Sequence, residues 1–184
     1  MASAREATPA TGRSPATGSK YDMFIQINGI KGDSTDDAHK DWIAVLNFEH
    51  SIVQPQGGDP SAQGVLTGGK AAHSDFTIGK RVDSASPILA QYVCSGQNIM
   101  DAKFEICRAM GEKTTFMVYE FKNFIISSVS PSGSASADDP VPVEEFTIRY
   151  GEITWSYTPT VITGGGKKKA AINAGWSTWQ NKKL

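Results

Sequence analysis

The stretch Val141–Thr158, VPVEEFTIRYGEITWSYT, constrains the fold more than any other part of the chain. Apolar residues occupy alternate positions up to Gly151 and then continue one residue out of phase: Phe146, Ile148, Tyr150, Ile153, Trp155 and Tyr157. A period of two predicts a long strand with one buried and one solvated face. The change of phase predicts a bulge or a sharp bend at Gly151. Such a long strand needs partners on both edges, which the rest of the chain must supply.

Further stretches of alternating or apolar residues predict the partner strands. They are Tyr21–Gly29, Asp41–Ile52, His73–Val82, Ile99–Ala109 and Thr114–Val129. Met110–Glu112 is a turn signal, so the last two should form a hairpin. The polar segments Lys31–Lys40 and Pro131–Pro140 are expected to be exposed loops.

One short helix is predicted to begin at Ser86 and to stop at Gly96. Serine is a favoured N-cap, Pro87 suits the first helical position, and glycine commonly ends a helix. At least six strands and one helix predict a mainly β protein. A closed or nearly closed antiparallel barrel is the expected architecture, because closure leaves no exposed sheet edges.

The chain of 184 residues is expected to hold one folded domain at 21–159. Residues 1–20 are rich in small and polar residues and are expected to be a disordered leader; they lack the apolar stretch of a signal peptide. No apolar run reaches the length that a membrane-spanning helix requires, so an integral membrane protein is not expected.

Residues 160–184 are expected to form a basic, flexible tail. They contain five lysines and no acidic residue, so the remainder carries a net −6 within a total of −1. An acidic body gives no support for nucleic-acid binding. Trp176 and Trp179 lie among the tail lysines and could stack on single-stranded nucleic acid. The favoured interpretation is that they anchor the tail on a neighbouring subunit, or that the tail stays loose.

The residues give no support for catalysis, a cofactor or a metal. No GxSxG elbow or phosphate-binding glycine motif is present. His39 lies in an acidic loop, but no second ligand stands at a recognised metal-site spacing, so a solvated surface is favoured. Cys94 and Cys107 are expected to be buried, reduced thiols, with a reactive pair as the minor alternative.

Val53–Ala71 is a long segment rich in glycine and proline. Loops of this length are uncommon in compact domains unless they are functional or disordered, and a functional role is favoured here. Gln54 and Pro55 at its start, and its apolar residues Val65 and Leu66, are the candidate contact residues.

Three stretches, in this order, resemble the haemolysin-coregulated protein (Hcp) family, the tube proteins of bacterial type VI secretion systems. They are FIQINGIKGDSTDDAHKDWI, SPILAQYVCSGQ and VPVEEFTIRYGEITWSYTP. The resemblance covers Tyr21 to about Thr160 and implies an antiparallel β-barrel of two sheets with one flanking helix. It also implies six-membered rings that stack into a tube expelled by a contracting sheath, with no enzymatic activity. Leader residues 1–20 depart from the family pattern.

The resemblance further implies the partners and the location. The partners would be other copies of the chain, the sheath, spike and baseplate proteins, and small effectors carried in the lumen. The protein would be cytoplasmic before assembly and then secreted without a signal peptide. Segment 53–71 would contact neighbouring subunits or the next ring, and Thr147 and Arg149 are candidates to face the lumen. The alternative is a monomeric barrel that binds a small ligand in an apolar cavity.

Overall fold

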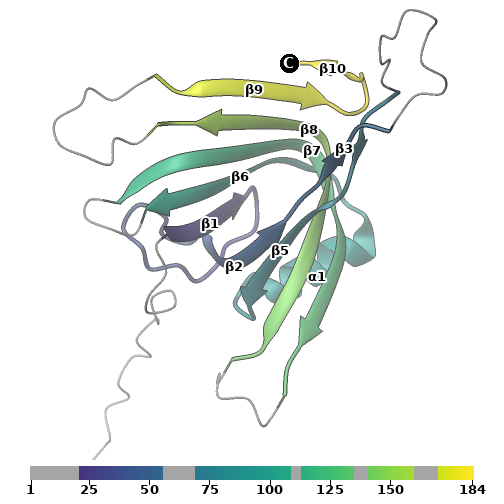
Figure 1. Ribbon diagram of the computed structural model, residues 1–184. Coiled ribbons are helices and arrows are strands. Elements are labelled where there is room, and N and C mark those ends of the chain that lie inside the picture. Colours follow the sequence, from purple (N-terminus) through teal and green to yellow (C-terminus); the bar gives the residue numbers. More distant parts are fainter. Residues whose placement is uncertain (1–20, 56–68, 109–112, 135–140, 160–169) are drawn as a thin grey trace, which may run out of the picture.

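The fold is a closed antiparallel barrel, shown here as a computed structural model that describes residues 21–55, 69–108, 113–134, 141–159 and 170–184. The hydrogen-bonded order is β8-β5-β2-β1-β6-β7, and β7 pairs again with β8 to complete the circle (Figure 1). The strands are β1 (Tyr21–Ile27), β2 (Ile43–Glu49), β5 (Phe76–Arg81), β6 (Ile99–Arg108), β7 (Thr114–Ser132) and β8 (Val143–Tyr157). The predicted mainly β barrel is therefore confirmed. The two sheets expected for it are continuous with each other and form one closed, hydrogen-bonded sheet.

The two longest strands, β7 and β8, hold the barrel together. They pair along almost their whole length, from Met117 opposite Tyr157 to Ser132 opposite Val143. The other edge of β8 has two successive partners: β5 as far as Ile148, and β9 (Ile172–Ser177) from Glu152 onward. A short β10 (Lys182–Lys183) pairs with β9 at the outer edge.

Gly151 lies where β8 changes partner, and the strand bends there (Figure 1). The β7–β8 register is the same on both sides of this point, and the opposite residue Asn123 has a positive φ of 50°. The sequence allowed a bulge or a bend, and the structure has the bend. The register slip between these strands lies instead at Ser127 of β7.

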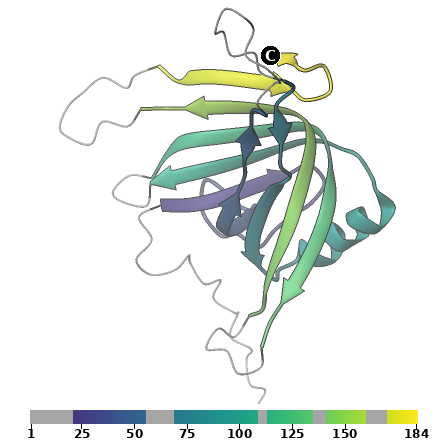
Figure 2. The same ribbon diagram turned by 45° about the vertical axis from the view of Figure 1, so that its right-hand side comes forward.

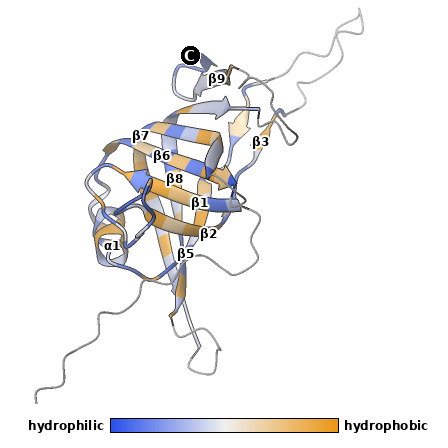
Figure 3. Cartoon of the chain, turned by 90° about the vertical axis from the view of Figure 1, so that its left-hand side faces the viewer, coloured by the Kyte–Doolittle hydropathy of each residue, from blue (hydrophilic) through white to orange (hydrophobic). Residues whose placement is uncertain are grey.

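The inward faces of the strands form an apolar core, visible as the hydrophobic stretches along the strands in Figure 3. Its centre is a group of aromatic rings whose neighbouring centroids lie 4.9–6.0 Å apart: Phe48, Phe76, Phe104, Tyr119, Phe121 and Tyr150. Such separations are typical of favourable aromatic packing.

The helix α1 (Ser86–Ser95) flanks the barrel and contacts β7. It ends, as expected, at Gly96, which adopts a left-handed conformation with φ 61°. The expected serine N-cap is wrong: Ala85 is the N-cap, and Ser86 is the first helical residue. The Ser86 hydroxyl instead donates to Glu144 of β8 at 2.6 Å.

That contact belongs to a buried charge network which the sequence analysis did not anticipate. Lys80 of β5 has no exposed surface, and its Nζ lies 2.7 Å from carboxylate oxygens of both Asp83 and Glu144. It also donates to Ser86 Oγ at 3.2 Å. A buried charge is tolerated when it is paired and hydrogen-bonded in this way. The network ties β5, β8 and the start of α1 together.

Several segments differ from the sequence expectations. Asp41–Ile52 contains β2 and the first residue of β3 (Ile52–Val53). His73–Val82 likewise contains the last residue of β4 (Ala72–His73) and the whole of β5. Cys94 is exposed, whereas Cys107 is buried as expected, and neither is in a disulfide. The end of the tail is not loose, because Ile172–Ser177 forms β9. The expected turn Met110–Glu112 lies outside the described residues.

Other expectations concern loops and spans. Pro131–Pro140 is only partly described, and its first two residues extend β7. Lys31–Lys40 is not uniformly exposed, because His39 is 3% exposed. The described helix is too short to cross a membrane.

We expect Gly151→Val to destabilise the barrel. A Cβ at this position would lie 3.1 Å from the backbone oxygen of Asn123 and 3.5 Å from Trp179, and valine adds two further methyl groups. Such overpacking typically costs about 1–3 kcal/mol. Urea unfolding of the valine variant should show this loss, with a smaller loss in Gly151→Ala. Wild-type stability in the valine variant would contradict the importance of the close approach.

Candidate functional site

A two-stranded ribbon, separate from the barrel sheet, carries the two ends of the long loop between β2 and β5. It consists of β3 and β4, with Ile52 opposite His73 and Val53 opposite Ala72 (Figure 2). Beyond it, the Gln54 side-chain amide donates to the Gly69 carbonyl at 2.5 Å. Gln54 and Pro55 are exposed. The other two candidate contact residues, Val65 and Leu66, lie outside the described residues.

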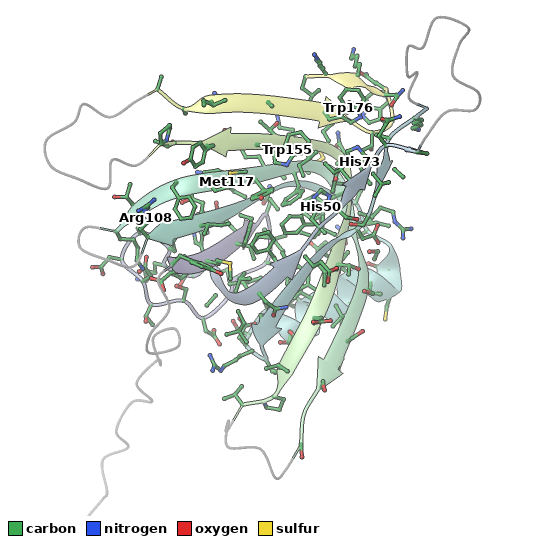
Figure 4. All side chains as sticks on the ribbon, in the orientation of Figure 1. His50, His73, Arg108, Met117, Trp155 and Trp176 are labelled. Carbon is green, nitrogen blue, oxygen red and sulfur yellow. The ribbon has the colours of Figure 1, made fainter. Side chains whose placement is uncertain are left out.

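The two chain segments that meet at the base of the ribbon are hydrogen-bonded to one barrel side chain. The Tyr150 hydroxyl of β8 lies 2.8 Å from His50 Nε2 and 2.8 Å from His73 Nδ1. Figure 4 shows these two histidines at the base of the ribbon. A phenol has one proton, so it donates to one imidazole and accepts from the other. Tyr150 therefore joins the segment entering the loop and the segment leaving it to the barrel wall.

The pKa values of these three side chains are shifted in the directions that favour their neutral forms. Burial lowers the pKa of His50, and the charge of a protonated His73 would lower it further. Burial likewise lowers the pKa of His73. Burial and the nearby Asp75 carboxylate raise the pKa of Tyr150 well above its usual value. Near neutral pH the three side chains therefore form an uncharged, hydrogen-bonded set.

A polar cluster lies beside them on the outer face of β8. Arg149 makes two 3.0 Å hydrogen bonds to the Asp75 carboxylate. Burial alone would raise the pKa of Asp75, but hydrogen bonds from Arg149 and Ser127 outweigh it and lower that pKa. Thr147 Oγ1 lies 2.6 Å from Ser127 Oγ, which the register slip in β7 directs toward Asp75. The two candidate lumen residues therefore share one polar face.

A surface pocket of about 290 Å³ lies between this cluster and the turn after β9, which contributes Thr178 and Trp179. It is lined in part by His73, Asp75, Arg149 and Trp179. Trp179 is 64% exposed, whereas Trp176 of β9 packs against the core of its own chain. Trp176 thus belongs to the monomer, which corrects its expected role in a loose arm. Trp179 remains available at the surface.

What the geometry shows at this site is a hydrogen-bonded connection between the ribbon and the barrel. The raised pKa of Tyr150 keeps it a neutral phenol, and the lowered pKa values of the two histidines keep them neutral imidazoles. The sequence analysis missed the set because Tyr150 was interpreted only as a core residue. One signal was present in the sequence: His50 and His73 stand just outside the two ends of segment 53–71.

Comparisons with known proteins agree on one family. Residues 24–157 match the family described as "Type VI secretion system effector, Hcp". The chain is 30% identical to Protein hcp1 of Pseudomonas aeruginosa over 161 residues, which cover 87% of this chain and 96% of that protein.

Solved structures show the same similarity. One, described as a type six secretion system protein, has 35% identity and a TM-score of 0.82, covering 89% of this chain and 99% of that one. Hcp1 from Salmonella typhimurium has 29% identity and a TM-score of 0.72, covering 90% and 100% of the two chains.

The histidine pair predicts a pH dependence of stability. Both folded-state pKa values lie below the ordinary 6.5, so the unfolded chain binds more protons just below that pH. The contribution of the two neutral histidines to the free energy of unfolding is complete above pH 6.5, and it should decline as the pH falls below that value. Urea unfolding at a series of pH values should show a smaller decline in a His50→Gln/His73→Gln variant. Equal declines in both proteins would contradict the assignment.

Proposed function

Because the chain belongs to the Hcp family of type VI secretion proteins, we propose that it is a subunit of the secretion tube. Six copies would close a ring, the rings would stack into the inner tube, and the contracting sheath would expel it. The observation that carries the proposal is the ribbon β3–β4, which lies outside the sheet of a closed, well-packed barrel and brings together the two ends of segment 53–71.

The surface of the ribbon supports a role in contacts between copies. Its first strand exposes 45% of Ile52 and 56% of Val53, although both are apolar. A second set lies beyond the bend, where the end of β8 pairs with the start of β9: Tyr157 is 43% exposed and Ile172 is 65% exposed. A closed ring needs two different complementary patches on each subunit. Two separate sets of exposed apolar residues meet that need.

The ribbon is also held rigidly enough to present such a contact. At its base, Tyr150 binds His50 and His73, one from each side of the ribbon, and at the outer end the Gln54–Gly69 hydrogen bond joins the two strands. A contact element that is already ordered loses less conformational entropy when it binds. We therefore assign stacking contacts to Gln54, Pro55, Val65 and Leu66.

The polar outer face of β8 fits a water-filled channel. Thr147 is half-buried and Arg149 is exposed, and both form polar contacts on this face. We propose that this face lines the lumen, through which small effectors pass. The remaining partners would be the sheath, spike and baseplate proteins, and the protein would move from the cytoplasm to the medium or a target cell with the tube.

The alternative of a monomeric ligand-binding barrel has less support. Its ligand would occupy the interior, but aromatic rings fill that space, and the side chains of Phe76, Phe104 and Phe121 have no exposed surface. A non-enzymatic role agrees with the neutral, hydrogen-bonded set around Tyr150.

We expect Val65→Asp or Leu66→Asp to weaken ring stacking without unfolding the subunit. Each introduces a charge that would lose its hydration in an apolar contact. Sedimentation velocity and electron microscopy at high protein concentration would show single rings in place of stacks. Met100→Asp is a matched control, because Met100 is apolar, 63% exposed and belongs to β6 rather than to segment 53–71. Normal stacking in both loop variants would contradict this role for the loop.

A further inference from the structure

A buried cluster of three metal-ligating side chains lies on the other side of the barrel, outside the site described above. The loop between β1 and β2 crosses the outer face of β6, and its residue His39 is only 3% exposed there. Beneath it lie Glu105 and Cys107 of β6, which are 8% and 0% exposed. These two residues are two apart in one strand and therefore share a face.

The ligand atoms of these side chains converge. His39 Nε2 lies 3.1 Å from Glu105 Oε2 and 3.8 Å from Cys107 Sγ. All three ligand atoms lie within 4.8 Å of one another. Among the residues that the structure describes, this is the group of histidine, cysteine and acidic side chains whose geometry could hold an ion.

We propose that His39, Glu105 and Cys107 form a binding site for a zinc-like divalent transition-metal ion. Thiolate, imidazole and carboxylate together are the ligand set of zinc, whereas magnesium and calcium prefer oxygen ligands alone. The two protons on Cys107 Sγ and on His39 Nε2 would leave as the ion binds, because only the deprotonated groups coordinate it.

The spacing of the ligand atoms agrees with a tetrahedral ion. Zinc lies about 2.0–2.1 Å from a nitrogen or oxygen ligand and about 2.3 Å from sulfur, so neighbouring ligands should be about 3.4 Å (N to O) and about 3.6 Å (N to S) apart. The observed separations are 3.1 and 3.8 Å. These two differ from the expected values by a few tenths of an ångström, and the third pair, Glu105 Oε2 and Cys107 Sγ, lies within 4.8 Å. Side-chain movements that bring this third pair closer would complete the geometry.

The surrounding contacts orient the ligands as metal sites require. His39 Nδ1 lies 2.7 Å from Asp36 Oδ1, and this carboxylate leaves the opposite ring nitrogen facing the cluster. A carboxylate behind a ligating histidine is the usual arrangement in zinc sites. The imidazole also stacks on Phe24, with centroids 4.2 Å apart and planes within 7°. The hydrogen bond with Asp36 and the stacking on Phe24 together fix the orientation of the His39 ring.

Glu105 is oriented in a similar way. Lys103 binds its other oxygen, Oε1, at 2.6 Å, so Oε2 is the atom directed at the cluster. Thr115 of β7 lies 2.8 Å from that oxygen and 3.3 Å from Cys107 Sγ. A slip in the β6–β7 register places Thr115 opposite Cys107. The Thr115 hydroxyl, or a water molecule beside it, would be the fourth ligand.

An ion at this position would cross-link the β1–β2 loop to the barrel wall. His39 comes from that loop, whereas Glu105 and Cys107 belong to β6. The same loop contributes Asp33–Asp37 to a second surface pocket of about 640 Å³, which also borders β1 and β2. Metal binding would therefore stabilise the shape of this part of the surface.

The test uses the full chain, stripped with a chelator and titrated with Co²⁺. We expect equimolar binding, with the near-ultraviolet absorption of a cobalt–thiolate bond, and displacement of cobalt by Zn²⁺. Cys107→Ser and His39→Gln should abolish that absorption. Asp36→Asn should weaken binding roughly 10- to 100-fold, as loss of an orienting partner does in other metal sites.

Cys94→Ser is the matched control, because Cys94 is an exposed cysteine on α1. It should bind cobalt as the wild-type chain does. Zn²⁺ should also raise the unfolding temperature of the wild-type chain and of Cys94→Ser, but not of Cys107→Ser. Circular dichroism of the metal-free variants checks that they are folded. No thiolate absorption in the wild type, or absorption that depends on Cys94, would overturn the proposal.

Discussion

The structure depends on the hydrogen bonding of one long, bent strand. Each backbone N–H and C=O of β8 that leaves water needs a partner, and a strand of 15 residues has many of them. β7 satisfies one edge along nearly the full length. The other edge is satisfied by β5 before Gly151 and by β9 after it. The bend allows the first half of β8 to close the barrel while the second half extends the sheet beyond it.

Buried or half-buried polar side chains then attach the irregular segments to this barrel. Lys80 joins the start of α1 to β5 and β8 through Ser86 and Glu144. Tyr150 joins the base of the ribbon to β8 through a histidine on each side. These contacts fix the ribbon and the start of the helix against the barrel, and the ring subunit proposed above would need surfaces held in fixed positions. The assembly proposed above would add partners to surfaces that these contacts already hold in place.

Much of the fold could be predicted from the sequence because it follows from alternation and turn chemistry. The pattern in residues 141–158 identified β8 and its change of phase, and Gly96 identified the end of α1. The tail was misjudged, because β9 has little alternation of its own and forms by pairing with β8. The contacts of Tyr150, and of His39 with Glu105, join residues 66 to 100 positions apart, and spacing along the chain cannot reveal them. The predicted contact role of Val65 and Leu66 stays a proposal, because both lie outside the described residues.

The most direct test of the central claim is the native mass of the purified chain, measured by light scattering over a range of protein concentrations. A tube subunit should show about six times the mass of the 19.7 kDa chain, with larger species as rings stack at high concentration. A monomer at every concentration would contradict ring formation by the chain alone. It would leave the barrel and its packed core as described.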